Sequence, residues 1–194
     1  VTSVSEVEEA LYLLDRDWHA VQEEEQVKIQ KPKIGIMVEV PSVLLQIEEF
    51  AELVDFFSVG SNDLTQYLLA VDRNNPRVAN VYSHFHPSVL RALSRLVKEC
   101  HKYDKPISLC GEMAGDPLSA VLLMAMGFNT LSMSSSNILR VRKAICHIPM
   151  TEAEQLLDKV LKMNNPLMVK SWMEYYFKTH GLADMVKTNR LVSV

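Results

Sequence analysis

The sequence predicts an α/β fold built on a parallel sheet. Four short apolar runs alternate with helical patterns along the chain, and polar or small residues follow each run. The runs are nearly continuous in apolar residues, as in strands that are buried on both faces. Together these observations favour β/α units over an all-helical or antiparallel architecture.

The order of elements follows from local signals. Ser3 and Glu6 form a capping box, and apolar residues then recur at helical spacing, so the chain opens with a helix. Strands are expected at 33–40, 55–60, 106–111 and 129–134. Helices are expected at 43–53, 63–70, 87–103, 117–126 and 137–148. Gly127 is a plausible C-cap, Thr151 and Glu154 suggest a further capping box, and the remainder is expected to be largely helical.

The strand count leaves two architectures open. A (β/α)₈ barrel needs eight strands and usually ~250 residues, whereas a small open α/β sheet accommodates four strands directly. The chain of 194 residues starts on a helix, as if the strand that feeds it were missing. The pattern therefore reads as half of a larger fold.

Composition excludes several function classes. The formal charge is −4 and no basic stripe is present, so nucleic acid is not an expected partner. No apolar run approaches the ~20 residues that span a bilayer, and the first residues do not resemble a signal peptide, so we expect a cytoplasmic protein without membrane contact. Three widely spaced cysteines predict reduced thiols, with Cys100 and Cys146 buried in helices.

Two carboxylates and a thiol follow the predicted strands. Ligands of parallel α/β folds lie at the carboxyl ends of the strands, where Glu39, Asp63 and Cys110 are found. Mg²⁺ prefers one or two carboxylates with the other positions left to water and substrate oxygens, so Glu39 and Asp63 predict a magnesium site.

The residues around Asp63 suggest an anion beside that metal. We expect Gly60 to adopt a backbone conformation that side chains forbid, and Ser61 and Asn62 to hold an anion. Arg73 lies one short helix further on and can return to a phosphate or carboxylate as a planar fork.

Three stretches carry a family resemblance. They are DFFSVGSNDLTQYLLAVDR at 55–73, GIMVEVP at 35–41 and CGEMAGDP at 110–117. They resemble the enzymes that use phosphoenolpyruvate (PEP), whose signature has Gly, Ser or Thr, Asn, Asp, a hydrophobic residue, any residue, Gln and a later Arg. All of these positions are met. YLLAVDRNNPRVANVY and HPSVLRAL resemble the nitrogen-branch form of enzyme I of the phosphotransferase system, and the likeness extends from about residue 1 to 148 and more weakly beyond.

The resemblance implies that residues 1–194 are the C-terminal part of a PEP-binding (β/α)₈ barrel, namely its last four β/α units with C-terminal helices. It implies that Glu39 and Asp63 hold Mg²⁺, and that Asn62, Asp63 and Arg73 bind PEP, with the amide and the arginine at its phosphate. It also implies that Cys110 protonates the enolate carbon. The phosphate acceptor would be a histidine of a separate N-terminal domain, the next partner an HPr-like carrier, and the assembly a homodimer.

The chemistry fits these implied roles. The departing enolate must gain a proton at carbon, and a cysteine thiol, with an ordinary pKa of ~8.5, can supply one at neutral pH. Two alternatives remain beside the phosphotransferase. One is a catalytically silent binding or dimerisation module, and the other is an enzyme of the pyruvate phosphate dikinase or PEP synthase type, which would use ATP.

Overall fold

The molecule is organised around one parallel sheet. A computed structural model describes residues 1–186, and its four strands are hydrogen-bonded in the order β1-β2-β3-β4. The strands are β1 Gly35–Val38, β2 Phe56–Gly60, β3 Ile107–Cys110 and β4 Thr130–Ser132. Each of the four lies inside its predicted run.

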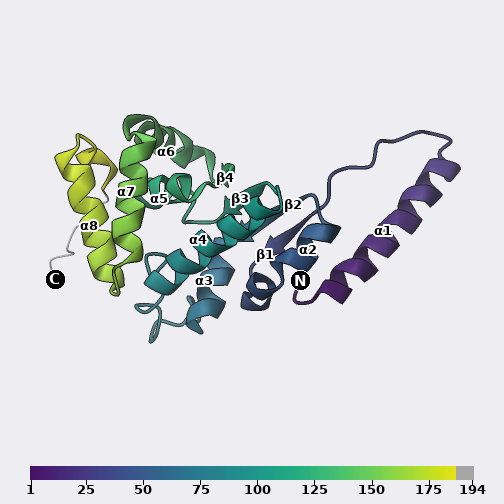
Figure 1. Cartoon of the computed structure of the whole chain (residues 1–194), viewed down its shortest axis with the longest axis horizontal. Coiled ribbons are helices and arrows are strands. Elements are labelled where there is room, and N and C mark those ends of the chain that lie inside the picture. The colour runs from purple at the N-terminus through teal and green to yellow at the C-terminus, as the bar shows by residue number, and fades with distance from the viewer. Residues whose placement is uncertain (187–194) are drawn as a thin grey trace.

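Helices connect the strands and continue beyond the last one (Figure 1). They are α1 Val4–Glu24, α2 Ile47–Leu53, α3 Ser61–Leu69, α4 Pro87–Lys102, α5 Pro117–Met126, α6 Ser135–His147, α7 Met150–Leu161 and α8 Pro166–Thr179. Two short 3₁₀ helices, η1 Pro41–Leu45 and η2 Ala183–Met185, complete the described elements. The predicted helix at 43–53 is thus two pieces, separated at Gln46, whose φ of −134° is not helical.

Helix caps confirm part of the sequence prediction. Ser3 caps α1 by accepting a hydrogen bond from the Glu6 backbone N–H at 3.4 Å. The Glu6 carboxylate accepts from the backbone N–H of Thr2 at 2.7 Å, so only half of the expected box forms. Gly127 ends α5 with a φ of 97°, as predicted for a left-handed C-cap.

The second capping box was wrong. The N-cap of α7 is Pro149, no side chain caps it, and Thr151 already lies inside the helix. Pro149 has no side-chain oxygen or nitrogen, so it cannot accept a hydrogen bond from the first N–H groups of α7.

Helices cover one face of the sheet. Six alternating strand residues are buried on that face: Ile36, Val38, Phe57, Val59, Ile107 and Leu109. On the other face Ser58, Ser108 and Cys110 are partly exposed, and Met37 is 41% exposed. The expectation of burial on both faces was therefore wrong for the described residues. A sheet whose strand order never reverses, and whose helices lie on one face, is part of a (β/α)₈ barrel and not a doubly wound open sheet.

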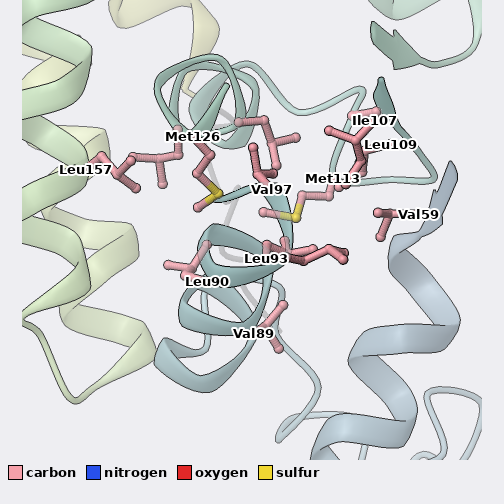
Figure 2. Packing of buried hydrophobic residues seen from close by; sticks show 14 of the residues in the cluster. Val59, Val89, Leu90, Leu93, Val97, Ile107, Leu109, Met113, Met126 and Leu157 are labelled. Atoms are coloured by element: carbon pink, nitrogen blue, oxygen red, sulfur yellow. The ribbon is translucent and has the colours of Figure 1, made fainter. Parts of the chain in front are cut away.

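The core lies between the sheet and the helices that follow it. Figure 2 shows side chains of α4, such as Leu93 and Val97, beside Ile107 and Leu109 of β3. Met113 fills the space between them and is 1% exposed. Met113 and Met126 are buried, and Met124 and Met133 are partly buried against the same core. This packing fixes the loops at the carboxyl ends of β2 and β3.

The two ends of the chain differ in how they join this core. Helix α1 extends from one end of the molecule, and Val7 is its one buried residue (Figure 1). Helices α7 and α8 lie at the opposite end, and α7 packs against α5. Across residues 1–186, no helix is both long and apolar enough to span a membrane.

Candidate functional site

The predicted site residues come from one edge of the sheet. Gly60 pairs with Cys110, and Cys110 pairs with Ser132, so these residues form a row across the carboxyl ends of β2, β3 and β4. Glu39 directly follows Val38, which pairs with Val59 one residue before Gly60. The sheet thereby brings Glu39 and Cys110 to the same edge.

Gly60 leaves room for Glu39. A Cβ added at Gly60 would lie 3.1 Å from Oε2 of Glu39 and 3.2 Å from the sulfur of Met37. Its φ is −82°, which any residue can adopt, so the expected need for an unusual backbone conformation was wrong. Glycine is needed here for space, because a side chain would press on the carboxylate.

Ser61 ties β2 to β3. It is 3% exposed, and its hydroxyl donates to the carbonyl oxygen of Cys110 at 2.6 Å. A hydroxyl engaged in this way has no second proton to offer an anion, so the side chain of Ser61 does not serve as the expected anion donor. Its contribution is structural: it fixes the start of α3 against the end of β3.

Asn62 is held by the loop that follows β3. Its Oδ1 accepts a hydrogen bond from the backbone N–H of Glu112 at 3.2 Å. Gly111 makes this approach possible, because its φ is 109° and an added Cβ would lie 2.5 Å from Oγ of Ser61 and 3.0 Å from Oδ1 of Asn62. The amide nitrogen of Asn62 makes no hydrogen bond within the described part of the chain, so it can donate to a ligand.

Arg73 reaches back to α3. Its Nη2 lies 3.4 Å from Oδ1 of Asp63, and its backbone N–H donates to Oε1 of Gln66 at 3.2 Å. Its Nη1 is buried and has no hydrogen-bond partner among residues 1–186. A buried guanidinium nitrogen without an acceptor is costly, and an anionic ligand would satisfy it.

Tyr82 contacts the same group of residues. Its hydroxyl donates to the backbone carbonyl of Asn62 at 3.2 Å. Burial raises the pKa of Tyr82, while the hydrogen bond and charge of Arg73 act in the opposite direction. The phenol is therefore protonated at neutral pH and acts as a donor to Asn62.

The three cysteines occupy different environments. Cys110 is partly exposed at the end of β3, and its thiol donates to the carbonyl of Val59 at 3.4 Å. Cys100 is buried in α4, as predicted, and burial raises its pKa to about 12. Cys146 is exposed, so its predicted burial was wrong; it follows the buried Ala144 by two positions, which turns it about 200° around α6.

The carboxylates suit a hard divalent cation. Glu39 lies beside Gly60 at the end of β1, and the Asp63 side chain, in the first turn of α3, is 42% exposed. No group of three or more His, Cys, Asp or Glu residues that could hold a metal occurs in the described residues. Two carboxylates leave most coordination positions of a Mg²⁺ ion to water and substrate oxygens. This is typical of a site that binds Mg²⁺ together with its substrate, whereas a structural metal site is closed by protein ligands.

A pocket of about 300 Å³ adjoins the row of strand ends. Glu112 and Asp116 contribute negative charge to its lining, and Arg140 and Lys170 contribute positive charge. None of the predicted ligand residues lines it, so the candidate site is the open row itself and not this pocket.

Comparison with known proteins agrees with this geometry. A family model described as "PEP-utilising enzyme, PEP-binding domain" matches residues 1–150. The chain belongs to this family. The chain is 41% identical over 187 residues to a Salmonella typhimurium protein named "Phosphoenolpyruvate-dependent phosphotransferase system", covering 96% of the chain and 25% of that protein. It is 35% identical over 178 residues to the "Phosphoenolpyruvate-protein phosphotransferase" of Bacillus subtilis, covering 92% of the chain and 31% of that protein.

The chain thus spans about a quarter of the length of its Salmonella relative and about a third of the Bacillus one.

Three residues of the site were not anticipated as contributors: Gln66, Tyr82 and Gly111. Gln66 belongs to the family signature and could have been found from it, since its side chain holds the backbone of Arg73. Tyr82 and Gly111 act through contacts with residues far away in the sequence, and no spacing rule points to them.

Proposed function

We propose that this chain is the PEP- and Mg²⁺-binding part of a PEP–protein phosphotransferase of the enzyme I type. The observation that carries the proposal is the buried Nη1 of Arg73, which lacks an acceptor within the described chain. It belongs to a side chain that also contacts Asp63. A PEP phosphate would supply the missing acceptor oxygens.

In the proposed complex, the amide of Asn62 and the guanidinium of Arg73 bind the phosphate, with Asp63 also at the substrate. Asn62 lies in the first turn of α3, where backbone N–H groups and the helix dipole favour an anion. Glu39 and Asp63 would hold the divalent cation. When bound, Mg²⁺ would offset negative charge on the substrate oxygens.

The proposed reaction transfers the phosphoryl group from PEP to a histidine outside these 194 residues. The bond from phosphorus to the enol oxygen breaks and a bond from phosphorus to the histidine nitrogen forms. The enolate left behind takes a proton at carbon from the thiol of Cys110, which yields pyruvate. We propose that the phosphoryl group then passes to an HPr-like carrier, and that the protein is a cytoplasmic homodimer of the nitrogen-branch type.

The alternatives make different use of the same residues. A silent binding module needs neither a buried guanidinium nitrogen without an acceptor nor a thiol at the strand end, so Nη1 of Arg73 and the thiol of Cys110 support the active form. A dikinase or PEP synthase would also bind PEP in this way, and ATP-dependent turnover of the intact protein would identify it.

Asp63→Ala tests the proposal in the intact protein. The variant should abolish Mg²⁺-dependent PEP turnover and leave the far-ultraviolet circular dichroism spectrum unchanged, because Asp63 is partly exposed on α3. Glu39→Gln, which keeps the side-chain shape and removes the charge, should do the same. Asp158→Ala, at an exposed position on α7, is the matched control. Near-normal turnover in both site variants would contradict the proposal.

A further inference from the structure

The segment between α3 and α4 carries both an arginine of the site and a tyrosine that contacts it. Residues 70–86 form loops and turns between the two helices, and Arg73 lies near the beginning of this segment. An arginine on a loop has many rotamers, and holding it in one geometry costs conformational entropy. Its neighbours therefore determine whether it is aimed at a ligand before the ligand arrives.

Two contacts and one neighbouring side chain restrict Arg73. Gln66 accepts from its backbone N–H, and Asp63 pairs with Nη2 at 3.4 Å. The third neighbour is Tyr82, whose phenol lies close enough to the guanidinium for the positive charge to act on the pKa of the phenol against the effect of burial. With these contacts made, Nη1 is the nitrogen that stays buried without an acceptor among residues 1–186.

Tyr82 also restrains the other proposed phosphate ligand. Its hydroxyl donates to the carbonyl of Asn62 at 3.2 Å, while the Oδ1 of the same residue accepts from the N–H of Glu112. Asn62 is thus held at its backbone from one side and at its side chain from the other. The phenol of Tyr82 thus bonds to one of the two residues that are proposed to bind phosphate and lies near the other.

We propose that Tyr82 is a positioning residue that aims Arg73 and Asn62 at the phosphate of PEP. This inference rests on the proposed function, because it assumes that the two residues bind that phosphate. The hydroxyl is bonded to Asn62 and lies near Arg73, so it sets the relative position of the two ligands. Positioning of this kind improves binding by reducing the ordering that the ligand must otherwise impose.

Tyr82→Phe removes the hydroxyl and keeps the ring. Loss of one such hydrogen bond corresponds to about a three- to tenfold change in an equilibrium constant. We therefore expect the variant of the intact protein to bind PEP, in the presence of Mg²⁺, about three- to tenfold more weakly. Oxalate imitates the enolate and has no phosphate, so its Mg²⁺-dependent affinity should change by less than about twofold. The matched control is Tyr67→Phe, since Tyr67 lies on α3 and is 54% exposed.

The measurement is calorimetric titration with PEP and with oxalate, accompanied by thermal unfolding of each variant. A selective loss of PEP affinity with an unchanged unfolding midpoint supports the inference. Unchanged PEP affinity, or an equal loss for PEP and oxalate, overturns the role of Tyr82 while the proposed function stands. If the unaltered protein binds neither ligand in the presence of Mg²⁺, the proposed function is wrong and this inference is wrong with it.

Discussion

Gly111→Ala tests how closely the loop after β3 must approach α3. The φ of Gly111 is 109°, and an L-residue held in such a region costs about 1–3 kcal/mol. An added Cβ would also lie 2.5 Å from Oγ of Ser61, whose hydroxyl donates to Cys110 at 2.6 Å. Displacing that hydroxyl forfeits about 0.5–1.5 kcal/mol. The expected loss in free energy of unfolding is about 2–4 kcal/mol.

Gly181→Ala separates the two contributions. Its φ of 76° imposes a similar backbone cost, but the nearest atom to an added Cβ is Nε2 of His147 at 3.7 Å, which is an ordinary contact. Gly181→Ala should therefore lose only the backbone part. Placing Gly111→Ala in a Ser61→Ala background should recover some of the difference, because the clashing oxygen is gone.

The assay is urea denaturation of the intact protein at one fixed protein concentration, with the midpoint and slope compared among the variants. Equal losses for Gly111→Ala and Gly181→Ala would refute the reasoning, because they would show that Ser61 yields without cost. A loss for Gly111→Ala that Ser61→Ala does not relieve would place the clash on Asn62 instead, at 3.0 Å.

Three other outcomes are expected. Cys110→Ala should slow single-turnover formation of pyruvate by the intact protein roughly 10²-fold or more, with little change in PEP affinity. Cys146→Ala, at an exposed position, is the control and should behave like the unaltered protein. A normal rate in Cys110→Ala would assign the proton to another group. Burial, together with the hydrogen bond and charge of Glu152, raises the pKa of Tyr176 to about 12 from 10.0, so the folded state holds this proton more tightly than the unfolded state does. The resulting stabilisation is complete below pH 10.0 and is lost as the pH rises towards about 12. The free energy of urea unfolding should therefore fall less between these pH values in Tyr176→Phe than in the unaltered protein. An equal fall in the two proteins would contradict the pKa shift. The 194-residue chain leaves one sheet face partly exposed, with Met37 at 41%, so it should self-associate or unfold without cooperativity, and a monodisperse, cooperatively unfolding monomer in sedimentation and calorimetry would contradict this.

The sequence predicts the elements well wherever local signals decide them. The strands and most helices follow from apolar periodicity and from Pro and Gly at their ends, which act over a few residues. The helix expected at 43–53 divides at Gln46, because Pro41 begins a 3₁₀ turn whose geometry does not continue into α2. The predicted positions of Glu39, Asp63 and Cys110 follow from one topological rule, that parallel strands end at the same edge.

The remainder depends on contacts between distant segments. From the sequence, Ser61 is predicted to donate to an anion. In the structure its hydroxyl donates instead to the carbonyl of Cys110 in β3, 49 residues later. Tyr82 is a loop residue in the sequence and a neighbour of Asn62 only in the fold. The phase of α6 decides that Cys146 faces solvent, and this phase is set by packing and not by composition.

The pairing of Asp63 with Arg73 suggests how the proposed ligands would enter together. Their side chains are 42% and 33% exposed, and an ion pair with this much solvent contact contributes about 0–1 kcal/mol. Such a pair is easily exchanged. A phosphate offers Arg73 a stronger partner, and the carboxylate of Asp63, once released, is available to a cation. Binding of phosphate to Arg73 and of the cation to Asp63 would each break the ion pair. When both bind, neither the guanidinium nor the carboxylate is left without an opposite charge, so each binding event removes the electrostatic cost of the other. On the proposed function, metal and phosphate binding are therefore favourably coupled through this one pair, and Tyr82 and Gln66 keep Arg73 close enough for the exchange to be a small movement.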